Sequence, residues 1–114
     1  MRAFFRIGEA WELTMDDQRA LLGWLPESTF YKYKAGKVTA LPFDMLERIS
    51  LILGIYKDLH ILYPDAGLAD RWLKLPNSNP LFGGRPALAF LKDGGMDALF
   101  HLRRLLDARR GAWN

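Results

Sequence analysis

The sequence predicts an all-α fold. Apolar residues recur at three- and four-residue steps along most of the chain, which is the period of an amphipathic helix. No segment of useful length alternates apolar and polar residues, so no β-strand is expected. Prolines, glycines and capping residues divide the helical pattern into short elements. The length of 114 residues suits one domain, or two very small domains that share a core.

The first part of the chain predicts two short helices. Residues 3–13 carry apolar side chains at helical spacing, with charged side chains on the other side. Thr14 then begins the stretch Thr-Met-Asp-Asp, in which a hydroxyl cap precedes acids that favour the positive end of a helix. A helix over residues 15–22 should follow, and Gly23 should end it.

A third helix is predicted from Glu27 to Ala35, because Pro26 and the residues after it favour a first turn and Gly36 favours a stop. Two helices separated by a glycine turn have the layout of a helix-turn-helix. Hydroxyls at the start of the second helix, and cations along it, are suited to phosphates and base edges. The alternative interpretation is that these cations only form a solvent-exposed face of the helix. The candidate DNA contacts are Ser28, Thr29, Tyr31, Lys32, Lys34 and Lys37.

Pro42 opens the next helical segment. Helices are expected over residues 43–53 and 55–63, with Gly54 between them. The apolar surface over residues 45–63 is wider than one buried face requires. It is either buried within the chain or paired with a second copy, and we predict a homodimer.

The chain divides at Pro64 into a predicted helix-turn-helix region, residues 1–64, and a second region, residues 65–114. The first region holds eight Lys/Arg and eight Asp/Glu, and the second holds eight Lys/Arg and five Asp, so the net charge of +3 comes from the second. In that second region the expected helices cover residues 66–74, 86–92 and 96–109, separated by a loop over 75–86 and by Gly94-Gly95.

The end of the chain combines arginines with an aromatic residue. This composition is favoured at protein–protein hot spots, although arginines also suit the negative end of a helix. The residues concerned are Arg103, Arg104, Arg109, Arg110 and Trp113.

Composition and motifs argue against an enzyme, a metal site or a secreted protein. Without cysteine there is no disulfide, cysteine-ligated zinc or thiol nucleophile, which fits a reducing setting. His60 and His101 have no evident acid–base partner, and residues 82–86 lack the pattern of a phosphate-binding loop. No signal-peptide pattern and no apolar run of about 18 residues occur, so we expect a cytoplasmic protein that needs no cofactor and no membrane.

Three stretches of the sequence resemble the MbcA/ParS/Xre antitoxins, which are partners of RES-domain toxins. Residues 28–36, Ser-Thr-Phe-Tyr-Lys-Tyr-Lys-Ala-Gly, resemble the recognition helix of that family, and residues 46–55 resemble the helix after it. The turn between Gly23 and Ser28 is one residue longer than the common spacing and contains a proline. The third stretch comprises Trp72-Leu73, Pro76-Asn77, Phe82-Gly83-Gly84, Pro86, Gly94-Gly95 and residues 103–111.

The resemblance implies a type II antitoxin in two parts. Its helix-turn-helix would bind the promoter of its own operon, and its second region would bind an NAD-consuming RES toxin and block the active-site cleft. The positions carried over as candidate toxin contacts are Arg109, Arg110, Trp113 and Asn114, to which the arginine-rich surface adds Arg103 and Arg104. The alternative is a stand-alone helix-turn-helix repressor whose second region serves oligomerisation.

Overall fold

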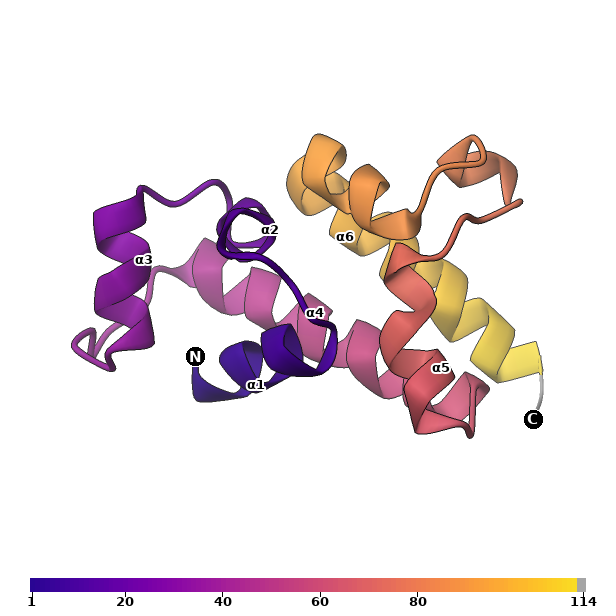
Figure 1. Cartoon of the computed structure of the whole chain (residues 1–114), viewed down its shortest axis with the longest axis horizontal. Coiled ribbons are helices and arrows are strands. Elements are labelled where there is room, and N and C mark those ends of the chain that lie inside the picture. The colour runs from indigo at the N-terminus through magenta and orange to yellow at the C-terminus, as the bar shows by residue number, and fades with distance from the viewer. Residues whose placement is uncertain (113–114) are drawn as a thin grey trace.

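A long helix, α4, crosses the centre of the molecule and contacts α1, α5 and α6 (Figure 1). The computed structural model describes residues 1–112, which confirm the all-α prediction. The α-helices are α1 (Arg2–Ala10), α2 (Met15–Leu21), α3 (Glu27–Lys34), α4 (Phe43–Leu62), α5 (Ala66–Arg71) and α6 (Ala87–Ala112), with 3-10 helices η1 (Trp72–Lys74) and η2 (Pro80–Phe82). Within these residues the only β pairing is an isolated bridge between Pro76 and Pro86.

Helix α3 and the end of α6 lie at opposite ends of the molecule's longest axis (Figure 1). The molecule measures 40 × 27 × 25 Å, so these two elements are well separated.

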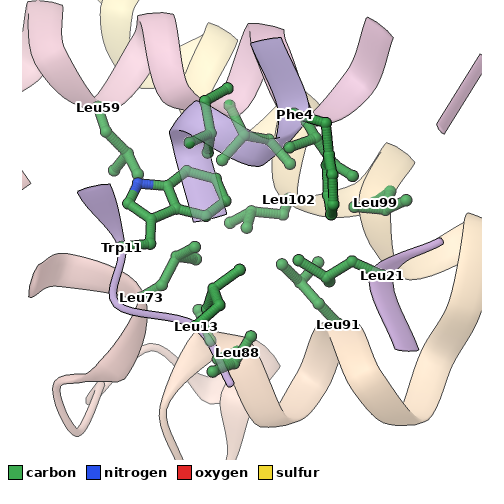
Figure 2. Packing of buried hydrophobic residues seen from close by; sticks show 14 of the residues in the cluster. Phe4, Trp11, Leu13, Leu21, Leu59, Leu73, Leu88, Leu91, Leu99 and Leu102 are labelled. Carbon is green, nitrogen blue, oxygen red and sulfur yellow. The ribbon is translucent and has the colours of Figure 1, made fainter. Parts of the chain in front are cut away.

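The predicted regions 1–64 and 65–114 share one apolar core. Figure 2 shows Trp11 from the first region among Leu73, Leu88 and Leu102 from the second. Trp11 is 1% exposed and Leu102 is fully buried. Because both regions contribute to the same cluster, the first region is held in shape partly by the second.

The predicted break at Gly54 is wrong: residues 43–62 form one continuous helix. Gly54 is buried, and a Cβ built on it would lie 1.1 Å from Nη1 of Arg103. The glycine therefore allows the Arg103 guanidinium to approach the helix backbone, and it does not end the helix.

The predicted break at Gly94-Gly95 is a kink within α6. Gly95 has φ 62° and ψ −144°, which interrupts the helical backbone at one position. Residues on both sides are helical, and the second segment continues past residue 109 to Ala112. The kink allows both segments of α6 to contribute to the core, through Leu91 before it and Leu99 after it.

The predicted start signal at Thr14 is confirmed as a capping box. The Thr14 hydroxyl accepts a hydrogen bond from the Asp17 backbone N–H at 3.0 Å, and the Asp17 carboxylate accepts one from the Thr14 N–H at 3.2 Å. The other Asp17 oxygen lies 2.7 Å from Nζ of Lys92, so the cap also joins α2 to α6. Burial raises the pKa of Asp17, but hydrogen bonds from Lys92 and Thr14 outweigh it and hold this pKa below its ordinary value of 3.8.

Replacing Asp17 by asparagine is expected to lower the free energy of unfolding by about 1–2 kcal/mol at neutral pH. Because the pKa is lowered on folding, this stabilisation is present above the ordinary value of 3.8 and is lost as the pH falls through the lower folded-state pKa. Urea unfolding of both proteins at neutral pH and near pH 3 measures the difference, which should shrink at the lower pH.

The neighbouring Asp16 provides the matched control. Its carboxylate is 70% exposed and pairs with Arg19 at 3.4 Å, so Asp16→Asn should change stability by only a few tenths of a kcal/mol. Equal losses from the two substitutions would contradict the role assigned to Asp17.

Candidate functional site

Helix α3 presents a polar outer face on an apolar base. Phe30 and Tyr33 face the core, and the Phe30 ring meets the Phe5 ring edge-on at a centroid distance of 5.6 Å. On the opposite side, Ser28, Tyr31 and Lys32 are spaced three and four residues apart and are exposed. The apolar pair therefore fixes which side of α3 faces solvent.

The remaining predicted DNA contacts flank this outer face. Lys34 is exposed on one side of the helix, and Thr29 is half-buried on the other. Lys37 is exposed just beyond the end of α3. The structure thus brings all six predicted residues to one end of the molecule, where hydroxyl, phenol and ammonium groups can meet phosphates and base edges.

The turn between α2 and α3 has a defined shape. Gly23 and Trp24 both have left-handed backbone conformations, with φ values of 86° and 59°. The Arg19 guanidinium donates a hydrogen bond to the Leu25 carbonyl at 2.7 Å and so ties the turn to α2. These contacts set the position of α3 relative to the helix before it.

Two of the C-terminal arginines hold α6 against α4. Nη1 of Arg110 lies 3.1 Å from one oxygen of Asp58, and Nε of Arg103 lies 3.4 Å from the other. Arg103 also donates to the Asp107 carboxylate at 2.9 Å. Asp58 is fully buried, so its charge depends on these two guanidinium groups.

The Asp58 and Asp107 carboxyl groups influence each other. Burial, and then the neighbouring Asp107 carboxyl group, raise the pKa of Asp58, while Arg110 and Arg103 oppose this change. The neighbouring Asp58 carboxyl group, followed by Arg103, lowers the pKa of Asp107, although burial opposes this change. Negative charge is therefore favoured on the exposed Asp107 over the buried Asp58.

The other predicted toxin contacts lie differently. Arg104 is exposed and Arg109 is half-buried, and neither forms an ion pair with another residue of the described range 1–112. Trp113 and Asn114 lie outside the described residues. Within residues 1–112, Arg103 and Arg110 therefore form ion pairs, whereas Arg104 and Arg109 do not.

Two comparisons with known proteins are informative. Residues 1–54 match the family described as the antitoxin Xre-like helix-turn-helix domain. Over 111 residues the chain is 43% identical to "Uncharacterized protein y4oB" of Sinorhizobium fredii (strain NBRC 101917 / NGR234), covering 97% of this chain and 84% of that protein. The chain belongs to the y4oB family and carries an antitoxin Xre-like helix-turn-helix domain. No solved structure matches it.

The Xre-like domain contains α1, α2, α3 and the first half of α4. A domain of this family implies DNA binding and a toxin partner, and supports either an antitoxin or a helix-turn-helix regulator. Within residues 1–112, no helix is both long and apolar enough to cross a membrane.

The Xre-like domain places two further cations beside α3, and neither is among the six predicted DNA contacts. Arg2 and Arg6 of α1 line a groove of about 440 Å³ together with Lys34 at the end of α3. Their spacing of four residues could have indicated that both arginines share one side of α1, away from the buried Phe4 and Ile7. Only the fold shows that this side of α1 lies beside α3.

The expectation that His60 lacks an acid–base partner is wrong. Its Nε2 lies 2.7 Å from the Asp70 carboxylate, which joins α4 to α5 next to the Xre-like domain. Both side chains are 26% exposed, and the Tyr56 ring packs against the imidazole.

The described part of the chain contains no group of three or more residues suited to hold a metal ion.

Proposed function

We propose that this chain is the antitoxin of a type II toxin–antitoxin pair. It binds a RES-domain, NAD-consuming toxin, occludes the active site of that toxin, and represses its own operon through α3. The observation that carries the proposal is an antitoxin-type helix-turn-helix domain followed by a helix whose last turns carry arginines. The resemblance of three stretches of the sequence to antitoxins of RES-domain toxins supports this class of toxin.

The toxin-binding role is assigned to the end of α6. Arg104 and Arg109 are not committed to internal ion pairs with the described residues, so their planar guanidinium groups can pair with anionic groups. A pocket built for an anionic dinucleotide suits such groups, which bind phosphate and carboxylate oxygens in a forked geometry. Arg103 and Arg110 support this role by holding the helix in place. Trp113 and Asn114 are assigned to the toxin contact from the sequence resemblance.

The separation of the two surfaces supports a dual role. Because α3 and the end of α6 lie at opposite ends of a 40 Å molecule, a toxin on α6 leaves α3 accessible (Figure 1). The chain can therefore bind DNA and toxin together, so a toxin–antitoxin complex can act as the repressor.

Co-expression with the neighbouring reading frame tests the proposal. Expression of that neighbour alone should stop growth and deplete NAD, and co-expression should restore both and yield a stable complex on purification. If the neighbour is harmless and does not co-purify, the antitoxin role is refuted, and a stand-alone repressor becomes the better description.

Replacing Lys32 and Lys34 together by glutamine is expected to weaken binding to operator DNA. Each lost phosphate contact should make the dependence of log K on log salt less steep by about 0.9. The loss should be similar for operator and unrelated duplexes, because ammonium–phosphate contacts carry no sequence information. Titration of labelled duplex at several salt concentrations measures both effects.

Lys57 provides the matched control for this double variant. It is exposed on α4 and is not among the predicted DNA contacts. Lys57→Gln should leave the salt dependence unchanged, whereas an unchanged curve for the Lys32 and Lys34 variant would remove those lysines from the DNA interface.

We propose that the homodimer forms through an exposed apolar stripe on α4. Most of the wide apolar surface predicted over residues 45–63 is buried within the chain, including Ile52, Ile55 and Leu59. Leu46 and Leu53 remain 51% and 37% exposed on one side of α4, and Phe43 before them is 81% exposed. Their spacing of three and seven residues forms a stripe that a second copy could cover.

Substituting Leu46 by glutamate should shift a dimer to monomer in light scattering at micromolar concentration, because a charge would have to be buried in the interface. Leu81→Glu is the control, because Leu81 is 38% exposed on η2, away from α4. A wild-type protein that is strictly monomeric at this concentration would contradict the proposed dimer.

A further inference from the structure

We propose that the groove between α1 and the end of α3 binds a backbone phosphate of the operator, through Arg2, Arg6 and Lys34. The inference rests on the proposed operator binding and extends the DNA-binding surface beyond the helix-turn-helix itself. It assigns α1 a direct contact with one strand of the duplex.

The groove is hollow, charged and accessible. It has a volume of about 440 Å³, and the residues that line it include Phe5 and Tyr33. Arg2 and Arg6 lie one helical turn apart on α1 and are exposed, and Lys34 faces them from α3. A phosphate placed here could be contacted from two helices at once.

The three cations are available to a ligand. None of them forms an ion pair with another residue in the described part of the chain. Glu9 is the one acid among the groove-lining residues, so the side chains that line the groove carry a net charge of +2, although the side chains of residues 1–64 are neutral overall. The positive charge of the Xre-like domain is therefore concentrated beside α3 rather than spread evenly.

The position of the groove favours duplex DNA as the ligand. A recognition helix in the major groove has sugar–phosphate strands on both sides, and elements beside the helix meet those strands. The groove opens beside Tyr33, Lys34, Ala35 and Gly36, which form the end of α3 and the residues just after it. Guanidinium groups bind phosphate oxygens in a forked geometry, so Arg2 and Arg6 are suited to fix the register of α3 on the duplex.

The test is a salt titration with the full chain and a labelled duplex that spans the region upstream of its own gene. For Arg2→Gln with Arg6→Gln, the slope of log K against log salt should be less steep by about 0.9, the value for one lost phosphate contact, with affinity lower by roughly tenfold near 0.1 M salt. Arg71→Gln with Arg85→Gln removes the same charge from α5 and the loop before α6, and should leave the slope unchanged. Glu9→Gln should strengthen binding several-fold, which a loss of folding could not produce.

Three results would overturn the inference. An unchanged slope for the Arg2 and Arg6 variant, with normal binding by the wild type, refutes the groove contact and leaves the proposed function standing. A wild type that binds this duplex no better than it binds unrelated DNA refutes operator binding, and the groove contact with it. A variant that binds DNA normally but loses affinity for the toxin assigns the groove to an acidic segment of that protein.

Discussion

Deleting residues 109–114 is expected to abolish rescue from the toxin, so that cells co-expressing the truncated chain and the toxin fail to grow. The deletion removes Arg109, Trp113 and Asn114, which the proposed function places in the active-site cleft. Leu106, which is fully buried, and the rest of the core remain. Growth on co-expression and the affinity of the purified proteins for each other measure the effect.

The same deletion also removes Arg110, whose guanidinium lies 3.1 Å from the buried Asp58 carboxylate. Arg110→Gln in the full-length chain is therefore the matched control, because it loses this contact but keeps the end of the chain. It should be less stable and still rescue growth. Full rescue by the truncated chain would refute occlusion by the C-terminal end.

Replacing Asp58 by alanine is expected to lower the free energy of unfolding by about 3 kcal/mol. Asp58 is fully buried, and its two oxygens face Arg103 and Arg110, so the substitution leaves two guanidinium groups without this partner and opens a small void. The arginine side chains are 30% and 36% exposed and can partly recover hydration, which keeps the loss near the lower end for a broken buried pair. Urea unfolding measures it.

Asp107 offers a matched comparison, because it also pairs with Arg103. Its carboxylate contacts Arg103 at 2.9 Å but is 47% exposed, so Asp107→Ala should cost less than about 1 kcal/mol. If the two alanine variants lost equal stability, the burial of Asp58 would not be the cause, and the network would not be what holds α6 on α4.

Local signals in the sequence predicted most of the helices. The capping box at Thr14 and the prolines before α3 and α4 act within one helical turn, so their effect can be read without knowledge of the fold. The exposure of Tyr31 and Lys32 also followed from local periodicity, because Phe30 and Tyr33 define the inner side of α3.

The features that the sequence did not reveal depend on contacts between distant segments. Gly54 has the signature of a helix end, yet it is buried inside α4 because Arg103, 49 residues later, packs against its backbone. Asp58 looks like an ordinary solvated acid until α6 brings two arginines to it. Likewise, only the fold brings Arg2 and Arg6 of α1 into one groove with Lys34 of α3.

The roles of the arginines at the end of the chain also depend on contacts between distant segments. Composition grouped Arg103, Arg104, Arg109 and Arg110 into one surface, whereas the structure divides them by their partners. Arg103 and Arg110 are bound to Asp58, whereas Arg104 and Arg109, to which we assign the toxin contact, form no ion pair within residues 1–112. The division could not be read from spacing alone, because it depends on which side of α6 faces α4.

The most direct test of the account is the rate at which this chain associates with the purified toxin when the toxin's NAD site is filled. A non-hydrolysable NAD analogue should slow association in proportion to the fraction of toxin that it occupies, and at saturating concentration it should nearly stop association, because both ligands need the same cleft. An association rate that does not change with the analogue would show that the chain binds elsewhere, and would contradict neutralisation by occlusion.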